Sequence, residues 1–474
     1  MPDPQVKTRS GGMTRVPQRA LDSFTAAFSG QLLTPDTPGY DAARGIWNAM
    51  IDRRPALIAR CASAADVALA VRLAASQDLL VAVRAGGHNI AGNALCEGGL
   101  VIDLSAMKQV DVDPVSRIAR VGPGATLGDV DRATQAHGLA TPLGINSTTG
   151  IAGLTLGGGF GWLSRSLGLT IDNLLSADVV TADGTPVRAS ASEHPDLFWG
   201  IRGGGGNFGV VTSFEFRLHP IGPDVLSGLV IHPLEEAAGV LRFYRDFLKR
   251  TPDQFVCWFV MRKAPPLPFL APEWHGREIL ALAVCYAGSI ADGERIAKPL
   301  REFGHPVADV VQPHPFTAWQ AVLDPLLAPG MRNYWKTHDF LDVSDGLIDV
   351  LVEHARRIPD PQTEIACAQL GGAVSRVPAD ATAYAHRDAQ FVMNVHGRWE
   401  DPAKDAACVG WARHLFQAAA PFATGGAYVN FLTEEEQGRV PAAYAGNYAR
   451  LVSLKRKYDP GNLFRVNQNI LPSA

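Results

Sequence analysis

Glycine is concentrated in one part of this 474-residue chain, and this clustering restricts the folds that the chain can adopt. The densest clusters within residues 84–209 are Gly86-Gly87, Gly157 to Gly161 and Gly203 to Gly206. Residues without a Cβ let two backbone segments, or a backbone and a ligand, approach more closely than other residues allow. Short β-type runs and two helical patterns, at residues 64–76 and 127–137, lie between the clusters. This region is therefore predicted to be an α+β domain of short strands joined by glycine-rich loops.

The pattern changes after Pro220, where longer strand-like segments alternate with amphipathic helical ones. Strands are predicted at residues 225–232, 255–262, 279–287, 364–370 and 391–397, and helices at residues 235–249, 291–303, 344–357 and 403–419. An antiparallel sheet with helices on one face would suit this order. A last helix is predicted at residues 448–457, and the Asp459-Pro460-Gly461 turn ends it before an extended tail.

Composition and charge exclude several classes of function. The 43 Lys and Arg residues and 47 Asp and Glu residues give a net charge of −4, so bulk electrostatics attract neither nucleic acid nor an anionic membrane. The chain also lacks an apolar run of the roughly 18 residues that a membrane span requires. We therefore expect neither nucleic acid nor a membrane as a partner. The N-terminal residues are polar and resemble no signal peptide, so a cytoplasmic location is expected. The six scattered cysteines predict buried free thiols.

The glycine motifs allow more than one interpretation when each is taken alone. Arg84-Ala85-Gly86-Gly87-His88-Asn89 follows a predicted buried strand, and such a loop can turn its backbone N–H groups toward a diphosphate. Taken alone, the loop is more typical of an ordinary glycine turn that carries a solvated histidine. Gly204, Gly206 and Gly209 match GxGxxG, but a helical segment precedes them and a strand follows, which excludes a Rossmann site. The sequence has no P-loop, metal-ligand spacing or GxSxG elbow.

Taken together and in this order, the motifs resemble the FAD-linked oxidases of the berberine bridge enzyme type, within the vanillyl-alcohol oxidase (PCMH) superfamily. The matching stretches are Arg84 to His88, Gly99 to Ser105, Gly157 to Gly161, Asp196 to Val211, Tyr428-Val429-Asn430 and Tyr458 to Arg465. The resemblance implies a two-domain α+β fold: a PCMH-type FAD-binding domain, and an antiparallel-sheet substrate domain. It divides the chain into an N-terminal extension (1–39), the FAD-binding domain (40–218), the substrate domain (219–424) and a C-terminal segment (425–474) that returns to the FAD domain.

The resemblance also implies how FAD is held. His88 occupies the position whose imidazole bonds covalently to the flavin in this family. Many members add a second link from a cysteine, but Asn146 stands at the matching position here, so a single covalent link is expected. The implied cofactor-binding residues are Arg84, Ala85, Gly86, Gly87, His88, Asn89, Thr149, Gly150, Gly153, Gly158, Gly209, Val210, Val211, Asn467 and Asn469.

Tyr428 is the implied catalytic residue, removing the substrate's hydroxyl proton while hydride leaves for the flavin. A free phenol titrates near ~10, so a base role needs a lowered pKa. Without the resemblance, Tyr428 is better interpreted as a packed strand aromatic. Asn430 is expected on the same face of that strand, holding the substrate or the flavin edge, and Gln369 is expected to line the substrate pocket.

These residues predict an FAD-dependent oxidase that converts an alcohol on a sugar, glycoside or other natural product to a carbonyl. Dioxygen is the expected acceptor and hydrogen peroxide the product, so a small-molecule substrate and dioxygen are the expected partners. Oxidation of a C–N bond, or electron transfer to an acceptor other than dioxygen, remains an alternative on the same fold. A flavin-binding protein without turnover is a further alternative. The oligomeric state and the natural substrate are left open.

Overall fold

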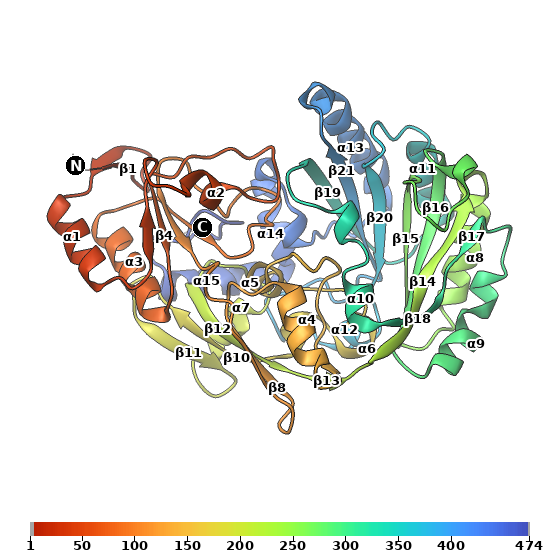
Figure 1. Cartoon of the computed structure of the whole chain (residues 1–474), viewed down its shortest axis with the longest axis horizontal. Coiled ribbons are helices and arrows are strands. Elements are labelled where there is room, and N and C mark those ends of the chain that lie inside the picture. The colour runs from red at the N-terminus through yellow and green to blue at the C-terminus, as the bar shows by residue number, and fades with distance from the viewer. Residues whose placement is uncertain (1–3, 473–474) are drawn as a thin grey trace.

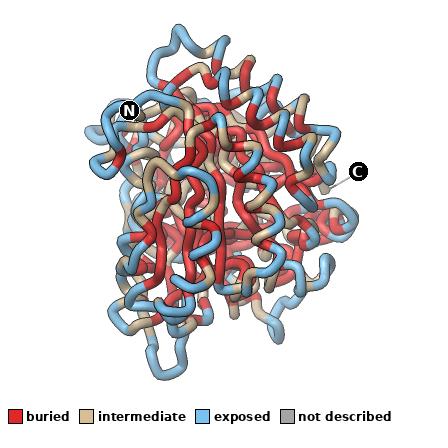
Figure 2. The backbone as a smooth tube through the Cα atoms, turned by 90° about the vertical axis from the view of Figure 1, so that its right-hand side faces the viewer, coloured by how far each residue is buried: buried red, intermediate tan, exposed pale blue. Residues whose placement is uncertain are grey.

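The computed structural model describes residues 4–472, which form two lobes side by side (Figure 1). The first lobe contains the N-terminal half of the chain and the C-terminal tail, and the second is built around one large sheet. Buried residues follow the strands through the middle of the molecule, whereas exposed residues lie on outer helices and loops (Figure 2). None of the helices within residues 4–472 is long and apolar enough to cross a membrane.

Two sheets form the first lobe. The four-stranded sheet has the order β3 (Gln31–Leu33), β4 (Leu57–Arg60), β6 (Leu100–Asp103) and β5 (Val81–Arg84), and β6 is parallel to both of its neighbours. The five-stranded sheet has the order β11 (Pro186–Ser190), β10 (Leu174–Val180), β12 (Val210–Arg217), β8 (Ile118–Val121) and β7 (Val110–Asp113). Helix α3 (Ala64–Ser76) contacts both sheets and buries its apolar face between them.

The local sequence explains where the helices of this lobe begin. The Ser63 side chain accepts the Asp66 N–H and the Asp66 carboxylate accepts the Ser63 N–H, a capping box that starts α3. Thr126 and Asp129 form the same arrangement at α4 (Leu127–Gln135). Both helices therefore begin where their sequence predicts. The predicted helix preceding the last glycine cluster is α7 (Pro195–Ile201).

The second lobe is an eight-stranded antiparallel sheet. Its main order is β17 (Ala308–Asp309), β14 (Asp224–Pro233), β16 (Glu278–Tyr286), β15 (Phe255–Lys263), β20 (Glu364–Gln369), β21 (Phe391–Trp399) and β19 (Arg332–Phe340), and β18 (Gln312–Pro315) also pairs with β14. The helices α8 (Ala237–Leu248), α9 (Ile290–Arg301), α11 (Asp345–Ala355) and α13 (Asp405–Ala419) pack on one face, as the sequence predicts. Alternate residues of each strand face the first lobe.

The C-terminal segment returns to the first lobe, as the resemblance implies. Helix α15 (Tyr448–Tyr458) packs on α7, and beyond it the Ile470 N–H donates to Asn207 Oδ1 over 3.0 Å. The buried Lys455 ammonium donates to Asp459 Oδ2, 2.7 Å away, and to the Asn207 carbonyl, 2.8 Å away. The prediction that Asn430 lies on a strand is wrong, because residues Val429–Phe431 form a short 3-10 helix.

The domain division by residue number stays a prediction, but the sheets cross one of its boundaries. Strand β3 lies within the expected extension of residues 1–39 and pairs with β4, so the first lobe's sheet begins before residue 40. Residues 1–3 and 473–474, which belong to the expected terminal segments, lie outside the described part of the chain.

Candidate active site

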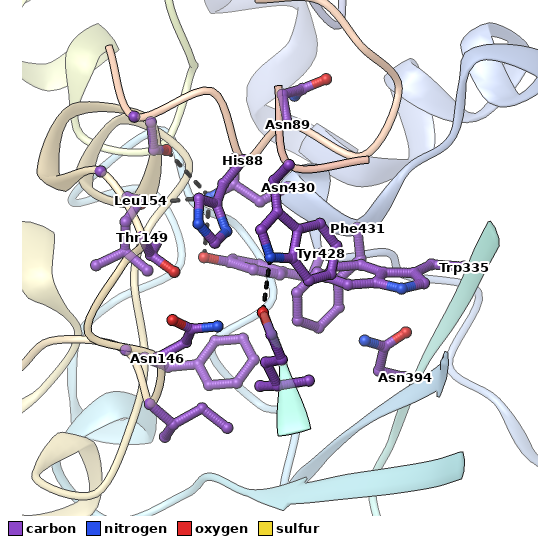
Figure 3. Close-up of a pocket in the computed structure, with 18 of the residues that line it drawn as sticks. His88, Asn89, Asn146, Thr149, Leu154, Trp335, Asn394, Tyr428, Asn430 and Phe431 are labelled. Atoms are coloured by element: carbon purple, nitrogen blue, oxygen red, sulfur yellow. Dashed lines mark hydrogen bonds between the residues drawn. The ribbon is translucent and has the colours of Figure 1, made fainter. Parts of the chain in front are cut away.

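A cavity of about 410 Å³ lies between the two lobes, and most of the predicted site residues line it. Its lining on the first lobe includes Ala85, Gly86, Gly87, His88, Asn89, Asn146, Thr149, Gly150, Gly153, Gly209, Val210 and Val211. The C-terminal segment adds Tyr428, Asn430 and Asn467. Figure 3 shows His88, Tyr428 and Asn430 close together at the centre of this cavity. The structure thus brings together residues that lie up to 382 positions apart in the chain, from Ala85 to Asn467.

The first glycine loop crosses the loop before α5 (Ile151–Leu156) in direct backbone contact. A Cβ placed on Gly86 would lie 2.5 Å from Gly150 Cα, so neither position can carry a side chain without separating the loops. Gly87 follows with a φ of +70°, in the left-handed region. Within residues 4–472, the backbone N–H groups of Gly87, His88 and Asn89 donate to no protein acceptor. Unpaired N–H groups beside a cavity form a cradle that fits a phosphate anion.

Hydrogen bonds fix the tautomer of His88. The Thr148 hydroxyl donates to Asn146 Oδ1 over 2.7 Å, and the same oxygen accepts the Thr148 N–H over 3.0 Å. Because the hydroxyl proton is used there, Thr148 Oγ1 must accept the 3.0 Å hydrogen bond that it shares with His88 Nε2. His88 Nε2 therefore carries the proton, and Nδ1 keeps its lone pair. Burial lowers the pKa of His88 to about 4, so the ring is neutral at pH 7.

Tyr428 is 2% exposed, and its hydroxyl oxygen accepts two N–H groups. The Gly159 N–H donates to it over 3.1 Å. Asn430 Nδ2 donates over 3.0 Å, and both Asn430 and Tyr428 are labelled in Figure 3. Burial raises the pKa of Tyr428 to about 12, and these two hydrogen bonds lower it only in part. The pKa is therefore higher than a base role would favour, and the side chain is a neutral phenol at pH 7 in the protein alone.

Four predicted residues lie outside the cavity lining. The Gly158 Cα lies against Tyr428, since a Cβ there would approach Tyr428 Cε2 to 3.4 Å. Arg84 and Asn469 are adjacent in sequence to lining residues, and each has a buried polar atom with no hydrogen-bond partner within residues 4–472. Gln369 points away, because it lies on the helix-covered face of β20. Its Oε1 accepts the Cys257 N–H over 3.0 Å, so this side chain links β20 to β15 and does not contact the cavity.

Sequence reasoning missed the aromatic side of the cavity. Trp47 stacks on the His88 ring with centroids 5.2 Å apart. Trp335 lies edge-on to Phe431 with centroids 5.3 Å apart, and Figure 3 labels both rings. His396 lies between the two tryptophans, with ring-centroid distances of 6.4 Å to Trp47 and 4.8 Å to Trp335. Trp47 comes from a loop near the N-terminus, Trp335 from β19 and His396 from β21, and none of the three belongs to a recognisable motif.

A buried ion pair borders the same side. Glu364 Oε2 accepts Arg262 Nη1 over 2.7 Å, and Glu364 Oε1 lies 3.1 Å from His396 Nδ1. Burial would raise the pKa of Glu364, but Arg262 and His396 outweigh it and hold the pKa at about 2. The carboxylate is therefore ionised and already paired, which leaves it little capacity to act as a base near pH 7.

The site has the features of a flavin-dependent oxidoreductase: a glycine cradle for a diphosphate, a neutral imidazole and a buried phenol around one cavity. Residues 55–190 match the FAD binding domain family, and residues 427–471 match the family described as berberine and berberine like. Both matches cover regions that line the cavity.

Relatives that match over nearly their whole length point to the same family. (R)-6-hydroxynicotine oxidase of Paenarthrobacter nicotinovorans is 33% identical over 464 residues, covering 94% of this chain and 98% of the relative. Xylooligosaccharide oxidase of Thermothelomyces thermophilus is 30% identical over 466 residues, covering 90% and 89%. The crystal structure of 6-hydroxy-D-nicotine oxidase from Arthrobacter nicotinovorans matches with a TM-score of 0.84 and 31% identity, covering 94% of this chain and 98% of that one.

This chain belongs to the berberine bridge enzyme-like family of FAD-linked oxidoreductases. The comparisons confirm the family, the α+β two-domain fold and the enzyme class that the motifs predict. The two characterised relatives act on chemically different substrates, a hydroxynicotine and xylooligosaccharides, by their names.

Proposed function

We propose that this protein is an oxidase that carries FAD on His88 and oxidises an alcohol to a carbonyl, with dioxygen as acceptor and hydrogen peroxide as product. The observation that carries the proposal is the Tyr428 hydroxyl, held by two N–H donors inside the cavity that His88 also lines. FAD bound in this cavity would supply the hydride acceptor and pass the electrons to dioxygen.

The glycine cradle and the tail would hold the cofactor. The unpaired N–H groups of Gly87 and His88 would bind the diphosphate, and the Gly86–Gly150 crossing would leave room for it. Asn467 lines the cavity from the C-terminal tail, and its Oδ1 is buried with no partner in residues 4–472. An unpaired buried acceptor is costly unless a ligand supplies a donor.

His88 is suited to covalent attachment through Nδ1. The Asn146–Thr148–His88 chain keeps the proton on Nε2, so Nδ1 presents a lone pair toward an electrophilic carbon. The lowered pKa keeps this nitrogen unprotonated at neutral pH. A second attachment is not expected, because the carboxamide of Asn146 cannot form a thioether.

Tyr428 would act on the substrate's hydroxyl group. As a phenolate it would take the hydroxyl proton while hydride leaves the carbon, and the Gly159 and Asn430 N–H groups would stabilise its negative charge. The raised pKa means that only a small fraction of the enzyme is in this form at pH 7. Alcohol oxidation by this route should therefore become faster as the pH rises.

Oxidation of a C–N bond is the second candidate, and the same pKa favours it. A neutral amine can lose hydride without first losing a hydroxyl proton, so a protonated Tyr428 is compatible with that reaction. The relative (R)-6-hydroxynicotine oxidase, at 33% identity, makes amines a necessary part of any substrate screen.

The test is anaerobic mixing of the flavin-loaded protein with panels of alcohols and amines, with flavin absorbance as the readout. We expect an alcohol to bleach the flavin, Tyr428→Phe to slow bleaching by about 100-fold or more, and readmitted air to release peroxide. Tyr286→Phe, on the helix-covered face, is the matched control. Bleaching by amines alone would select the second candidate. Flavin that stays reduced in air and is reoxidised only by an added artificial electron acceptor would indicate a dehydrogenase, and no bleaching would leave a flavin-binding protein without turnover.

A further inference from the structure

The wall that the second lobe contributes to the cavity is mostly apolar. On β14, β15 and β16, the lining residues are Leu229, Ile231, Trp258, Val260, Arg262, Ile279, Ala281 and Ala283. Of these, Arg262 alone is charged, and it is paired with Glu364. Two loops extend this surface with Pro265, Leu267, Leu323, Leu326 and Leu327. A substrate that reaches the flavin must lie against these side chains, so its body must tolerate loss of water on that side.

Aromatic rings complete the wall on the side of Tyr428. The Phe160 ring lies 4.8 Å from the Tyr428 ring and 5.9 Å from the Trp258 ring, measured between centroids. Trp162 packs against Trp258 with centroids 4.7 Å apart. A flat ring system would make the largest dispersion contact with such a surface.

The polar side chains of the cavity lining fall into two groups: Arg262, Glu364 and His396 are hydrogen-bonded to one another, whereas several other polar atoms have no partner within residues 4–472. The indole nitrogens of Trp162, Trp258 and Trp335, all in cavity-lining residues, are buried and donate to no acceptor within residues 4–472. A buried N–H without an acceptor is unfavourable, so a ligand oxygen that accepted from one would gain affinity. Asn394 is the reverse case, since its Oδ1 is buried with no donor in the described part of the chain.

Resting on the oxidase function above, we propose that the substrate is an alcohol on an aromatic or polycyclic body that carries ether or carbonyl oxygens. The apolar part of the wall takes the body, the indole N–H groups donate to its oxygens, and Asn394 accepts from a hydroxyl. An oligosaccharide fits poorly, because each sugar ring brings several hydroxyl groups that need both donors and acceptors. Along most of this wall those hydroxyls would meet leucine, isoleucine and alanine, and the polar side chains of Arg262, Glu364 and His396 are already paired with one another.

The experiment measures binding, so that turnover is not required. Flavin-loaded protein is titrated with 2-methoxynaphthalene, 2-ethylnaphthalene and xylobiose, and the dissociation constants are read from the perturbed visible flavin spectrum. The two naphthalenes have no alcohol group and nearly the same shape, and they differ only in that an ether oxygen replaces a CH2 group. We expect 2-methoxynaphthalene to bind about 5- to 10-fold more tightly than 2-ethylnaphthalene, the value of one neutral hydrogen bond, and xylobiose to bind more weakly than either.

Tryptophan-to-phenylalanine variants then locate the donor. At least one of Trp162→Phe, Trp258→Phe and Trp335→Phe should abolish the methoxy preference and change the affinity for 2-ethylnaphthalene by less than about twofold, because an aromatic ring is kept. Trp411→Phe is the control, since its indole N–H already donates to the His354 carbonyl over 3.1 Å. Flavin content and the unfolding temperature show whether each variant is folded.

Tighter binding of xylobiose, or a methoxy preference that survives in all three variants, would overturn the proposed substrate class. Either result would leave the oxidase function intact if alcohols still bleached the flavin through Tyr428. Protein that binds no flavin would instead contradict the proposed function itself. The two failures are therefore distinguishable.

Discussion

Replacing Gly86 with alanine should damage flavin binding more than any other single methyl group added to the cradle. The new Cβ would lie 2.5 Å from both the Cα and the N of Gly150. Carbon atoms rest at about 3.5–4.0 Å, so the two loops must separate by about 1 Å. Both contacting atoms are backbone, so no rotamer change can relieve the overlap. We expect a loss of about 1–3 kcal/mol in the free energy of unfolding, together with an opened cradle that holds less FAD.

The assay compares the ratio of flavin to protein absorbance and the unfolding temperature of purified wild type and Gly86→Ala. Gly410→Ala is the matched control, because Gly410 lies inside α13 and a Cβ there meets nothing within 4 Å. The control should keep its flavin and gain about 0.5–1 kcal/mol. Full flavin content and an unchanged unfolding temperature in Gly86→Ala would refute the close crossing of these loops.

Three further outcomes can be measured on single variants. Thr148→Val removes the acceptor for His88 Nε2–H, so covalent flavin should form more slowly, and a time course of flavin fluorescence on denaturing gels would show it. With an alcohol, kcat/KM should keep rising above pH 8 without a plateau below about pH 10, because the pKa of Tyr428 is about 12; a bell centred at pH 7 would argue against the phenolate. Burial raises the pKa of Asp131 to about 7, so the folded state holds a proton that the unfolded state loses from about pH 4 upward. The free energy of unfolding of Asp131→Asn should therefore exceed that of wild type by a margin that grows from pH 4 to pH 8, up to about 4 kcal/mol. Urea unfolding at pH 4 and at pH 8 measures this margin, and the same margin at both pH values would contradict the prediction.

Local signals in the sequence were sufficient for most of the fold. The capping residues Ser63 and Thr126 mark helix starts that the structure confirms, and nearly continuous apolar runs mark β14, β15 and β16. Strand β19 was not predicted, because Lys336, His338 and Asp339 interrupt its apolar pattern. These polar residues are buried by long-range packing, as when the Lys336 ammonium donates to Glu435 Oε1 over 2.6 Å. No local pattern contains that partner.

The candidate site divides in the same way. His88 and Tyr428 belong to motifs that follow one another along the chain in the family's order, so the resemblance could assign a role to each. The structure brings both side chains to one cavity. Trp47 and Trp335 stand in no motif and reach the cavity only through the packing of the two lobes. The prediction that Gln369 lines the substrate pocket is wrong, because neighbouring residues of β20 point to opposite faces of the sheet. Gln369 lies on the face that the helices cover, where it accepts the Cys257 N–H. The raised pKa of Tyr428 likewise depends on burial that sequence does not report.

The chemical state of the flavin in purified protein tests the central claim most directly. Wild type and His88→Ala are denatured in acid, washed, digested and examined for flavin fluorescence and peptide mass. We expect flavin on one wild-type peptide, the one containing His88, and none on any peptide of the variant. Flavin that washes out of the wild type, or a second labelled peptide, would contradict attachment through His88 alone.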